Sequence, residues 1–175
     1  MTTYKVDAAH SEIAFTVRHM MFAKVRGQFT KWTAELEYDA DDPTKSKARA
    51  EIDTTSIDTR EAARDGHLRS ADFFDTEHFP KMVFVSKSVE PAGKGRYKVL
   101  GDLTIRDQTH EVSLEVEETG RGRDPWGNDR IGFSAKGSLS REKWGLKWNQ
   151  ALEAGGVLVS DKVEIDVEAQ VVQSK

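Results

Sequence analysis

The fold of this chain is decided by the stretch EIAFTVRH, residues 12–19. Its apolar side chains at Ile13, Phe15 and Val17 alternate with other side chains along the segment. A repeat of two residues is typical of a β-strand with one apolar and one polar face. The same alternation returns along the chain, and no long helical pattern interrupts it. The sequence therefore predicts an all-β protein whose sheet wraps around an apolar interior, which either side chains or a ligand would fill.

Composition predicts one domain that covers residues 1–175. This length suits a single hydrophobic core, and no linker, repeat or low-complexity segment divides the chain. The net charge of −4 argues against a nucleic-acid partner, which would need clustered lysine and arginine. The chain has no cysteine, so disulfides, thiolate metal sites and cysteine catalysis are excluded.

The N-terminal residues and the apolar runs bear on localisation. The first residues, MTTYKVD, contain no apolar segment typical of a secretory signal, so we expect a cytoplasmic protein without a leader. No apolar run approaches the length that spans a membrane. These features predict a protein that neither spans a membrane nor binds nucleic acid.

Alternating segments predict about eight antiparallel strands in meander order. The second is unusually long, residues 25–39, and its apolar face changes near Thr30-Lys31, as one extra residue in a bulge would cause. The later strands cover residues 47–53, 81–90, 97–105, 112–116, 131–139 and 163–171, and a Gly- and Asp-rich loop covers residues 120–128. Eight strands are the number at which a barrel can hold one small ligand. We therefore predict an eight-stranded antiparallel barrel.

One segment departs from the strand pattern. Residues 58–69 include EAARDGHLR and favour a short helix between strands, with Asp58 or Thr59 as its N-cap. Phe73 and Phe74 follow in an acidic setting. A later proline then returns the chain to an extended conformation.

The histidines give no sign of a metal site or of catalysis. None of the five forms an i, i+2 or i, i+4 pair with another, so no metal ligation is predicted. His19 shares the apolar face of the first strand, and we expect it to point into the barrel. His67 lies near Arg64 and Asp65, but no nucleophile or oxyanion-hole motif accompanies this set. We interpret these three residues as a polar latch that ties the helix to the barrel rim.

Aromatic and small side chains together bear on whether the interior is open. Each aromatic residue alone is compatible with a packed core. Small residues share the apolar strand faces, namely Ala14 or Gly27, Ala48, Ala50, Gly101, Ala135 and Gly137. A tall barrel lined by small side chains leaves a lumen, and Met20-Met21-Phe22 would line its entrance. The predicted lumen and entrance residues are Phe15, Val17, His19, Met21, Phe22, Phe29, Trp32, Phe73, Phe74, Phe84, Leu103, Phe133, Leu139, Trp144 and Trp148.

A series of short motifs runs in order through nearly the whole chain. The motifs are VDAAHS (6–11), KVRGQF (24–29), DGHLRSADFFD (65–75), FPKMVF (79–84), GDLTI (101–105) and WNQALEAGGVLVSD (148–161). This series resembles that of the YceI-like proteins. Because the match covers most of the chain, the resemblance is specific.

The resemblance implies a lipocalin-like barrel with a helix beside it, often a homodimer, that binds an isoprenoid lipid threaded through its interior. The chain would then sequester or carry a polyprenyl or quinone-like lipid, with no other cofactor, no metal and no catalysis. The lipid headgroup would lie near Arg64, Asp65 and His67. Two other hypotheses stay open. One is an enzyme that acts on a lipid-like substrate with His19 or His67 as base, and the other is a ligand-free dimeric stress or scaffold protein.

Overall fold

The structure is a computed structural model that describes residues 1–153 and 155–174. Ala154, which lies in the last of the motifs above, and Lys175 are outside the described residues. The strands are β1 (Thr2–Val6), β2 (Glu12–His19), β3 (Ala23–Phe29), β4 (Trp32–Tyr38), β5 (Lys47–Asp53), β6 (Ile57–Asp58), β7 (Lys81–Pro91), β8 (Arg96–Ile105), β9 (Gln108–Arg123), β10 (Asp129–Ser140) and β11 (Lys162–Gln173). The helical elements are α1 (Ala62–Arg69) and the 3₁₀ turns η1 (Ala8–His10), η2 (Pro43–Lys45), η3 (Thr54–Ser56) and η4 (Arg141–Trp144).

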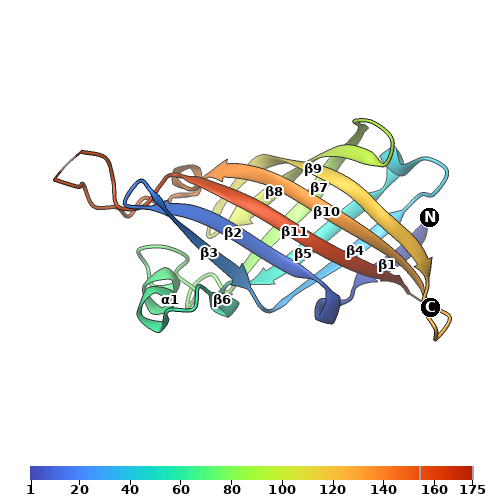
Figure 1. Cartoon of the computed structure of the whole chain (residues 1–175), viewed down its shortest axis with the longest axis horizontal. Coiled ribbons are helices and arrows are strands. Elements are labelled where there is room, and N and C mark those ends of the chain that lie inside the picture. Colours follow the sequence, from blue (N-terminus) through green and yellow to red (C-terminus); the bar gives the residue numbers. More distant parts are fainter. Residues whose placement is uncertain (154, 175) are drawn as a thin grey trace.

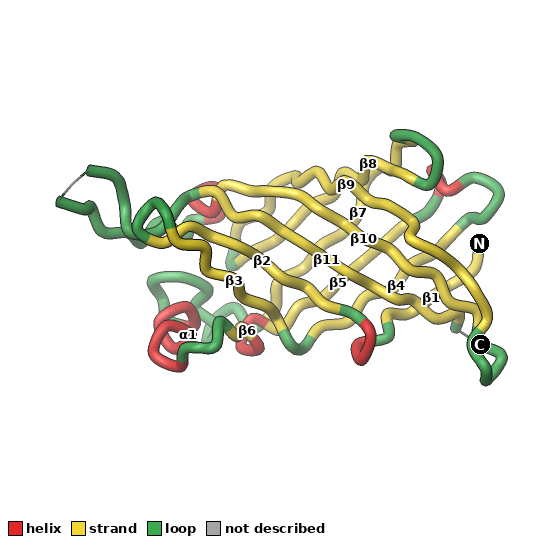
Figure 2. The backbone as a smooth tube through the Cα atoms, in the orientation of Figure 1, coloured by secondary structure: helices red, strands yellow, loops and turns green. Residues whose placement is uncertain are grey.

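These strands form one closed antiparallel barrel. Eight of them follow the order β1-β4-β5-β7-β8-β9-β10-β11, and β1 also pairs with β11, which closes the ring (Figure 1). The other three strands, β2, β3 and β6, extend the sheet toward the end where α1 lies (Figure 2). The predicted all-β, eight-stranded antiparallel barrel with a short helix is confirmed.

The extra strands are parts of longer strands that the chain interrupts. β11 pairs with β2 along its middle and with β1 near its C-terminal end, so β1 and β2 are two halves of one strand broken by η1. β3 and β4 are the halves of the long strand predicted over residues 25–39, and Thr30 and Lys31 separate them. The break leaves Phe29 and Trp32 in the same buried cluster. This explains the change of apolar face in the sequence.

The barrel wall is split at the end that holds α1, whereas both chain termini lie at the other end (Figure 1). The β9–β10 ladder stops at the pair Glu115 and Lys136, although β10 continues along β11 to Ser140. η4 follows directly and buries Trp144, whose side chain is 2% exposed. Its Nε1 donates a hydrogen bond to the Leu103 carbonyl on β8 at 2.8 Å. A buried indole therefore stands where the last rungs of the ladder are missing.

The N-cap of the helix differs from the prediction. Glu61 caps α1, because its carboxylate accepts hydrogen bonds from the backbone N–H groups of Ala63 and Arg64 at 3.1 and 3.0 Å. Neither Asp58 nor Thr59 is the cap. The reason is that β6 still includes Asp58, so the helix begins later than the composition suggested. Its C-terminal residue, Arg69, is the one predicted.

The loop predicted over residues 120–128 is also shorter than expected. β9 continues to Arg123 and β10 begins at Asp129, so five residues form the connection. A bulge between Gly132 and Phe133 shifts the register of β10 against β9. Glycine usually weakens a strand, which is why the pattern favoured a loop there.

Buried apolar side chains form two separate clusters. The larger cluster lies at the α1 end and consists of Phe29, Trp32, Ile52, Ile57, Phe73, Met82, Leu103, Ile105, Val112, Trp144 and Leu146. The smaller cluster lies toward the termini and consists of Tyr38, Ile131 and Val171. A uniformly packed barrel would join the two clusters into one contiguous core. Their separation directs attention to the interior between them.

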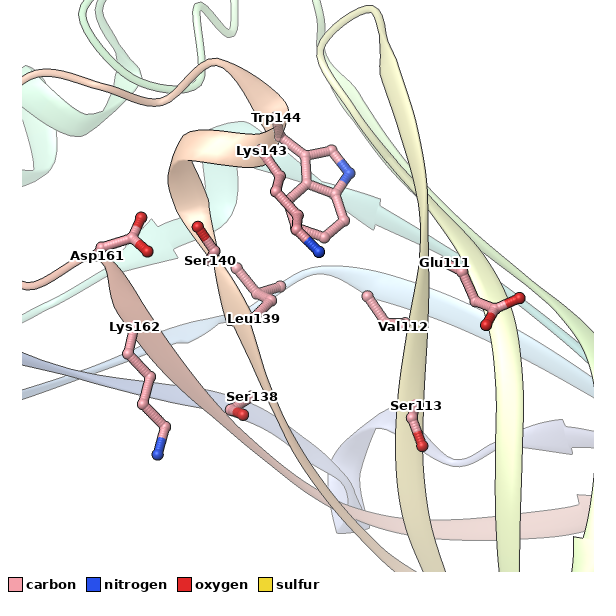
Figure 3. A pocket seen from close by; sticks show the side chains of 10 residues that line it. All are labelled: Glu111, Val112, Ser113, Ser138, Leu139, Ser140, Lys143, Trp144, Asp161 and Lys162. Carbon is pink, nitrogen blue, oxygen red and sulfur yellow. The ribbon is translucent and has the colours of Figure 1, made fainter.

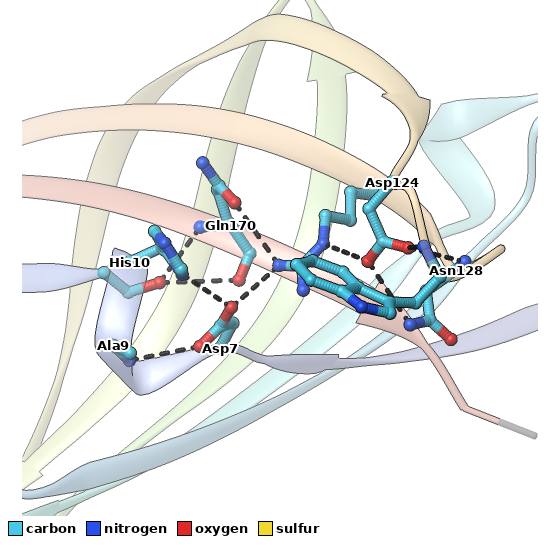
Figure 4. Close-up of polar contacts among 9 residues, drawn as sticks. Asp7, Ala9, His10, Asp124, Asn128 and Gln170 are labelled. Carbon is cyan, nitrogen blue, oxygen red and sulfur yellow. Dashed lines mark hydrogen bonds and ion pairs between the residues drawn. The ribbon is translucent and has the colours of Figure 1, made fainter.

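A charged cluster ties the N-terminal strand to the β9–β10 loop near the termini (Figure 4). Arg130 donates from Nη1 to Asp7 Oδ2 at 2.7 Å and from Nε to Asp124 Oδ2 at 2.8 Å. Asp7 also lies 2.8 Å from the His10 ring, and Asp124 accepts hydrogen bonds from backbone N–H groups of its own loop. The bonds from Arg130 hold the pKa of both carboxyl groups below their usual range.

We expect Arg130→Gln to flatten the loss of stability in acid. The lowered pKa values mean that Asp7 and Asp124 stabilise the folded state above their unfolded pKa of about 3.9, and that this contribution is lost as the pH falls through that value and below it. Thermal unfolding between about pH 6 and pH 3 measures the slope. Arg123→Gln removes only an exposed pair with Asp129 and should keep the wild-type slope. An Arg130→Gln slope equal to that of wild type would contradict the prediction.

Candidate functional site

Several apolar side chains on the inward faces of the strands are not fully buried. Phe15, Phe84 and Leu139 pack against the larger cluster and Phe133 packs against the smaller one, yet each is only half-buried. A closely packed core leaves no such surface, because its voids are smaller than a water molecule. Because these side chains share strand faces with buried residues, their exposed part faces the interior or the ends of the barrel, and this apolar surface is the candidate site.

Small side chains also lie on the inward faces of the strands. Ala34 and Ala50 are opposite each other on β4 and β5, and both adjoin the larger cluster. On β10, Ala135 lies on the same face as Phe133 and Leu139, because alternate residues share a face. Each alanine leaves room that a larger side chain would occupy.

The three glycines that the sequence analysis counted as open space have a different role. A Cβ on Gly27 would lie 2.4 Å from the Phe15 ring, and a Cβ on Gly101 would lie 2.4 Å from the Phe84 ring. These two glycines make room for phenylalanine rings rather than for a ligand, and a Cβ on Gly137 would likewise lie 2.9 Å from Leu114 Cδ2. Ala14 is on the opposite face of β2 from Phe15, so it does not line the interior either.

Most of the predicted lumen residues gather around the larger cluster. Those buried in it or packed against it are Phe15, Phe29, Trp32, Phe73, Phe74, Phe84, Leu103, Leu139, Trp144 and Trp148. Phe133 belongs with the smaller cluster. Val17, His19, Met21 and Phe22 lie apart, further along β2 and at the tip of its hairpin.

His67 and two aromatic side chains form part of the rim beside α1. The His67 ring lies 4.5 Å from the Trp148 ring and 5.1 Å from the Phe73 ring, in both cases edge to face. Its Nε2 is 2.9 Å from Asp72 Oδ2, which restrains the imidazole. A partly exposed imidazole between aromatic rings offers one polar contact at the border of apolar surface.

Arg64 and Asp65 are engaged with the end of β6. Thr59 donates to Asp65 Oδ1 from its backbone nitrogen at 2.9 Å and from Oγ1 at 2.6 Å. Arg64 donates from Nε to Thr59 Oγ1 at 2.7 Å and from Nη2 to the Thr59 carbonyl at 2.8 Å. These bonds hold α1 against the barrel. Of the three polar residues singled out in the sequence, His67 is the one beside the aromatic rim.

A buried arginine that the sequence analysis did not single out supports the same aromatic part of the rim. Arg141 is 5% exposed, and its guanidinium lies 5.8 Å from the Phe73 ring. The guanidinium donates to the carbonyls of Leu146, Trp148, Val159 and Ser160. Burial lowers the pKa of Arg141. Because one arginine carries five N–H donors in a fixed fork, it can join two chain segments that share no strand pairing.

An opening in the wall leads toward the larger cluster through the split between β9 and β10 (Figure 3). It is a cavity of about 290 Å³. Val112, Leu139 and Trp144 line it, and each belongs to the larger cluster or packs against it. Charged side chains, Glu111, Lys143, Asp161 and Lys162, also line the cavity. The split therefore brings polar groups and interior apolar surface together.

Two further properties concern residues 1–153 and 155–174. Histidine and carboxylate side chains in this part of the chain do not gather in a group of three that could hold a metal ion. In the same residues, the helices are too short or too polar to cross a membrane. The chemistry of the site is thus apolar surface with a few polar groups at its borders.

A closed eight-stranded antiparallel barrel with partly exposed apolar side chains on its inward faces and a helix beside its split end has a lipocalin-like fold. The family of YceI-like domains matches the chain over residues 4–171. The chain belongs to the YceI-like family.

Among proteins of similar sequence are members of the UPF0312 group. A UPF0312 protein of Staphylococcus epidermidis is 41% identical over 171 residues, which cover 97% of each chain. A UPF0312 protein of Staphylococcus aureus is 40% identical with the same coverage. These relatives span the barrel from end to end.

Solved structures share the fold at lower identity. BcnA of Burkholderia cenocepacia superposes with a TM-score of 0.83 at 24% identity, over 94% of this chain and 98% of that one. A YCEI protein of Campylobacter jejuni gives 0.79 at 25% identity, over 90% of both chains. A domain of Saccharophagus degradans, described as polyisoprenoid binding, gives 0.72 at 15% identity, over 99% of this chain and 100% of that one.

We expect Gly27→Ala to destabilise the barrel by about 1–3 kcal/mol, because the added Cβ would displace the Phe15 ring in the packed interior. Gly66→Ala is the matched control. Nothing lies within 4 Å of a Cβ there, and alanine inside α1 should stabilise the helix by about 0.8–1 kcal/mol. Urea unfolding measures both changes. Equal stability of Gly27→Ala and wild type would show that the Phe15 ring does not rest on this glycine.

Proposed function

We propose that this protein binds a long-chain isoprenoid-type lipid, polyprenyl or quinone-like, with its apolar chain inside the barrel and its headgroup at the rim beside α1. The observation that carries the proposal is the set of partly exposed apolar side chains on inward strand faces beside the two buried clusters. Covering such surface with an apolar chain is favourable by about 25 cal/mol per Å². Binding of this kind needs no reaction and no metal.

The proportions of the barrel favour a long ligand over a compact one. β9 alone contains 16 residues, and strands rise about 3.3 Å per residue, so this strand is roughly 50 Å long. Strands of a barrel tilt by about 35–45° from its axis, so the interior is shorter than the strand but still suits an extended chain. The polyisoprenoid-binding domain of Saccharophagus degradans has the same fold, which is compatible with this class of ligand.

The three polar residues at the rim differ in whether they are available to contact a headgroup. His67 lies beside Trp148 and Phe73, so it can donate or accept a hydrogen bond where the apolar surface ends. We assign Arg64 and Asp65 a supporting role, because their bonds to Thr59 hold α1 in place. The headgroup contact therefore falls mainly to His67.

Two other hypotheses have less support. An enzyme that uses His19 or His67 as base would also need an activated nucleophile or an oxyanion hole, and the pairing of His67 with Asp72 supplies neither. A ligand-free scaffold would need a packed interior, against which the half-buried Phe84 and Phe133 argue. Homodimerisation, cytoplasmic localisation and a part in transport or stress response are further proposals.

We expect Ala135→Trp to lower lipid binding by about tenfold or more, because the indole would fill space between Phe133 and Leu139. Lys136→Trp is the matched control, since the neighbouring side chain is exposed and lies on the outer face of the same strand. Binding of a radiolabelled polyprenol to the purified protein measures the effect. Circular dichroism establishes that both variants fold.

The control and the test separate the hypotheses. If both variants lose the same amount of lipid binding, the loss is an effect on folding. If both bind lipid as well as wild type, the lipid lies outside the barrel. Solvent extraction and mass spectrometry of the wild type give an independent measurement. Recovery of an isoprenoid supports the proposal, whereas a protein that neither retains nor takes up lipid supports the scaffold hypothesis.

We expect His67→Ala to weaken binding of a polyprenyl phosphate by about 1.5–3 kcal/mol, the value of one hydrogen bond to a charged group. The recovered lipid should be chemically unchanged. If the protein is instead an enzyme with His67 as base, converted lipid should accumulate, and the variant should lose turnover by at least about 100-fold. His10→Ala, which removes an exposed histidine paired with Asp7, is the control and should bind like wild type.

A further inference from the structure

The tip of the β2–β3 hairpin exposes three consecutive apolar side chains. Met20, Met21 and Phe22 are 41%, 55% and 74% exposed. The hairpin projects beyond the barrel at the end that holds α1 (Figure 1). Single exposed apolar residues are common, but a run of large ones at a projecting tip marks a surface that contacts something other than water.

The backbone conformation of this turn does not favour the methionines that occupy it. The Phe22 N–H donates to the His19 carbonyl at 3.3 Å, and the φ angles of Met20 and Met21 are 53° and 70°. A two-residue turn with positive φ at both central positions favours Asn-Gly. Methionine in the left-handed region costs conformational energy. The methionines are therefore unfavourable for the turn as well as for hydration.

Two cations lie directly behind the apolar tip. Arg18 on β2 is paired in register with Lys24 on β3, and both are exposed. Like charges that face each other across a strand pair are destabilising. Among the residues that the structure describes, neither forms an ion pair within 4.0 Å. Residues 16–30 contain no acidic residue, although the chain as a whole has a net charge of −4.

A second loop adjoins the tip. The Met20 N–H donates to the Leu158 carbonyl at 2.8 Å, and the Met21 side chain lies against Gly156. This loop follows Trp148, whose ring adjoins His67 at the rim. The hairpin tip is thus connected to the rim of the proposed lipid site through one short segment.

We propose that the hairpin tip, residues 20–22, docks into the surface of an anionic lipid bilayer, with Arg18 and Lys24 against the phosphate groups. An anionic bilayer offers both of the partners that this surface lacks. Its acyl region covers apolar side chains, and its anionic headgroups attract the two opposed cations. Each cation near such a surface contributes about 1 kcal/mol to the free energy of membrane binding.

The dimensions of the hairpin fit this arrangement. Arg18 and Lys24 are each two residues from the apolar tip, so at about 3.3 Å per residue they lie roughly 7 Å behind it. Interfacial segments bury their apolar face about 5–10 Å into the headgroup and acyl boundary. The cations would then be at the level of the phosphates when the tip is immersed. This docking does not depend on lipid binding in the barrel interior.

The test is co-sedimentation with vesicles of phosphatidylglycerol and phosphatidylcholine in equal parts, compared with phosphatidylcholine alone. The wild type should bind the anionic vesicles and should dissociate as the salt concentration rises, because exposed charges are screened. Phe22→Ser should lower the partition coefficient by about tenfold or more. Trp126→Ser is the matched control, since Trp126 is 77% exposed but lies in the β9–β10 loop near the termini, and it should change binding by less than about twofold.

Arg18→Gln is the second variant and separates docking from a structural role. Removing one of two opposed cations should leave thermal stability equal or slightly higher, because it relieves repulsion with Lys24. The same change should weaken binding to anionic vesicles about fivefold, the equivalent of about 1 kcal/mol. A variant that loses stability together with vesicle binding would contradict the proposal.

Other outcomes would also overturn the docking proposal. These are equal losses in Phe22→Ser and Trp126→Ser, and wild-type binding that does not distinguish the two kinds of vesicle. If the tip instead joins two copies of the chain, Phe22→Ser will lower the sedimentation coefficient and leave vesicle binding unchanged. The Ala135→Trp variant should still bind vesicles, so failure of the proposed lipid site and failure of docking are distinguishable.

Discussion

β11 has different neighbours on its two sides, and the rest of the barrel depends on how it pairs with them. On one side it pairs with β10 along nearly its whole length, from Lys162, which is opposite Ser140, to Val172, which is opposite Arg130. On the other side it pairs first with β2 and then with β1, across the interruption at η1. Because a closed ring removes the free edges of a sheet, this arrangement both closes the wall and forces the chain to leave and rejoin it at Asp7. The bonds from Arg130 to Asp7 stabilise that corner.

The opposite end of the barrel, beside α1, is open because a strand pairing ends early there. The β9–β10 ladder stops before β10 ends, and Trp144 occupies the split instead of further backbone pairing. Arg141 then donates to four carbonyls on two chain segments, Leu146 and Trp148 before the loop and Val159 and Ser160 after it. Polar backbone groups must be paired when buried, so a split of this kind needs a multivalent donor. One end of the wall is thus held by its ladders, and the other by side chains that also line an opening.

The sequence predicted what depends on local periodicity and missed what depends on long-range contacts. Alternation gave the strands, because a residue's face follows from its neighbours two positions away. It also placed Phe15, Phe84 and Phe133 on inward faces. The cap at Glu61 was missed because cap choice depended on where β6 ended. Arg141 was missed because its carbonyl partners are defined only once the loop has folded. Gly27 was misread because a glycine looks the same in sequence whether it faces a ring or empty space.

For the proposed ligand, the two parts of the site would contribute differently. Hydrophobic burial is nearly proportional to area and has no direction, so the interior can retain an apolar chain but distinguishes such chains mainly by length and width. Hydrogen bonds do have direction, and a polar group left unpaired is costly, so selectivity among lipids with similar chains must come from the rim. His67 has the required position there, since its imidazole is held between Trp148 and Asp72 while part of it faces solvent. These separate roles of the interior and the rim follow from the fold. An antiparallel barrel pairs its backbone hydrogen-bonding groups within the wall, and its polar side chains remain available at the ends.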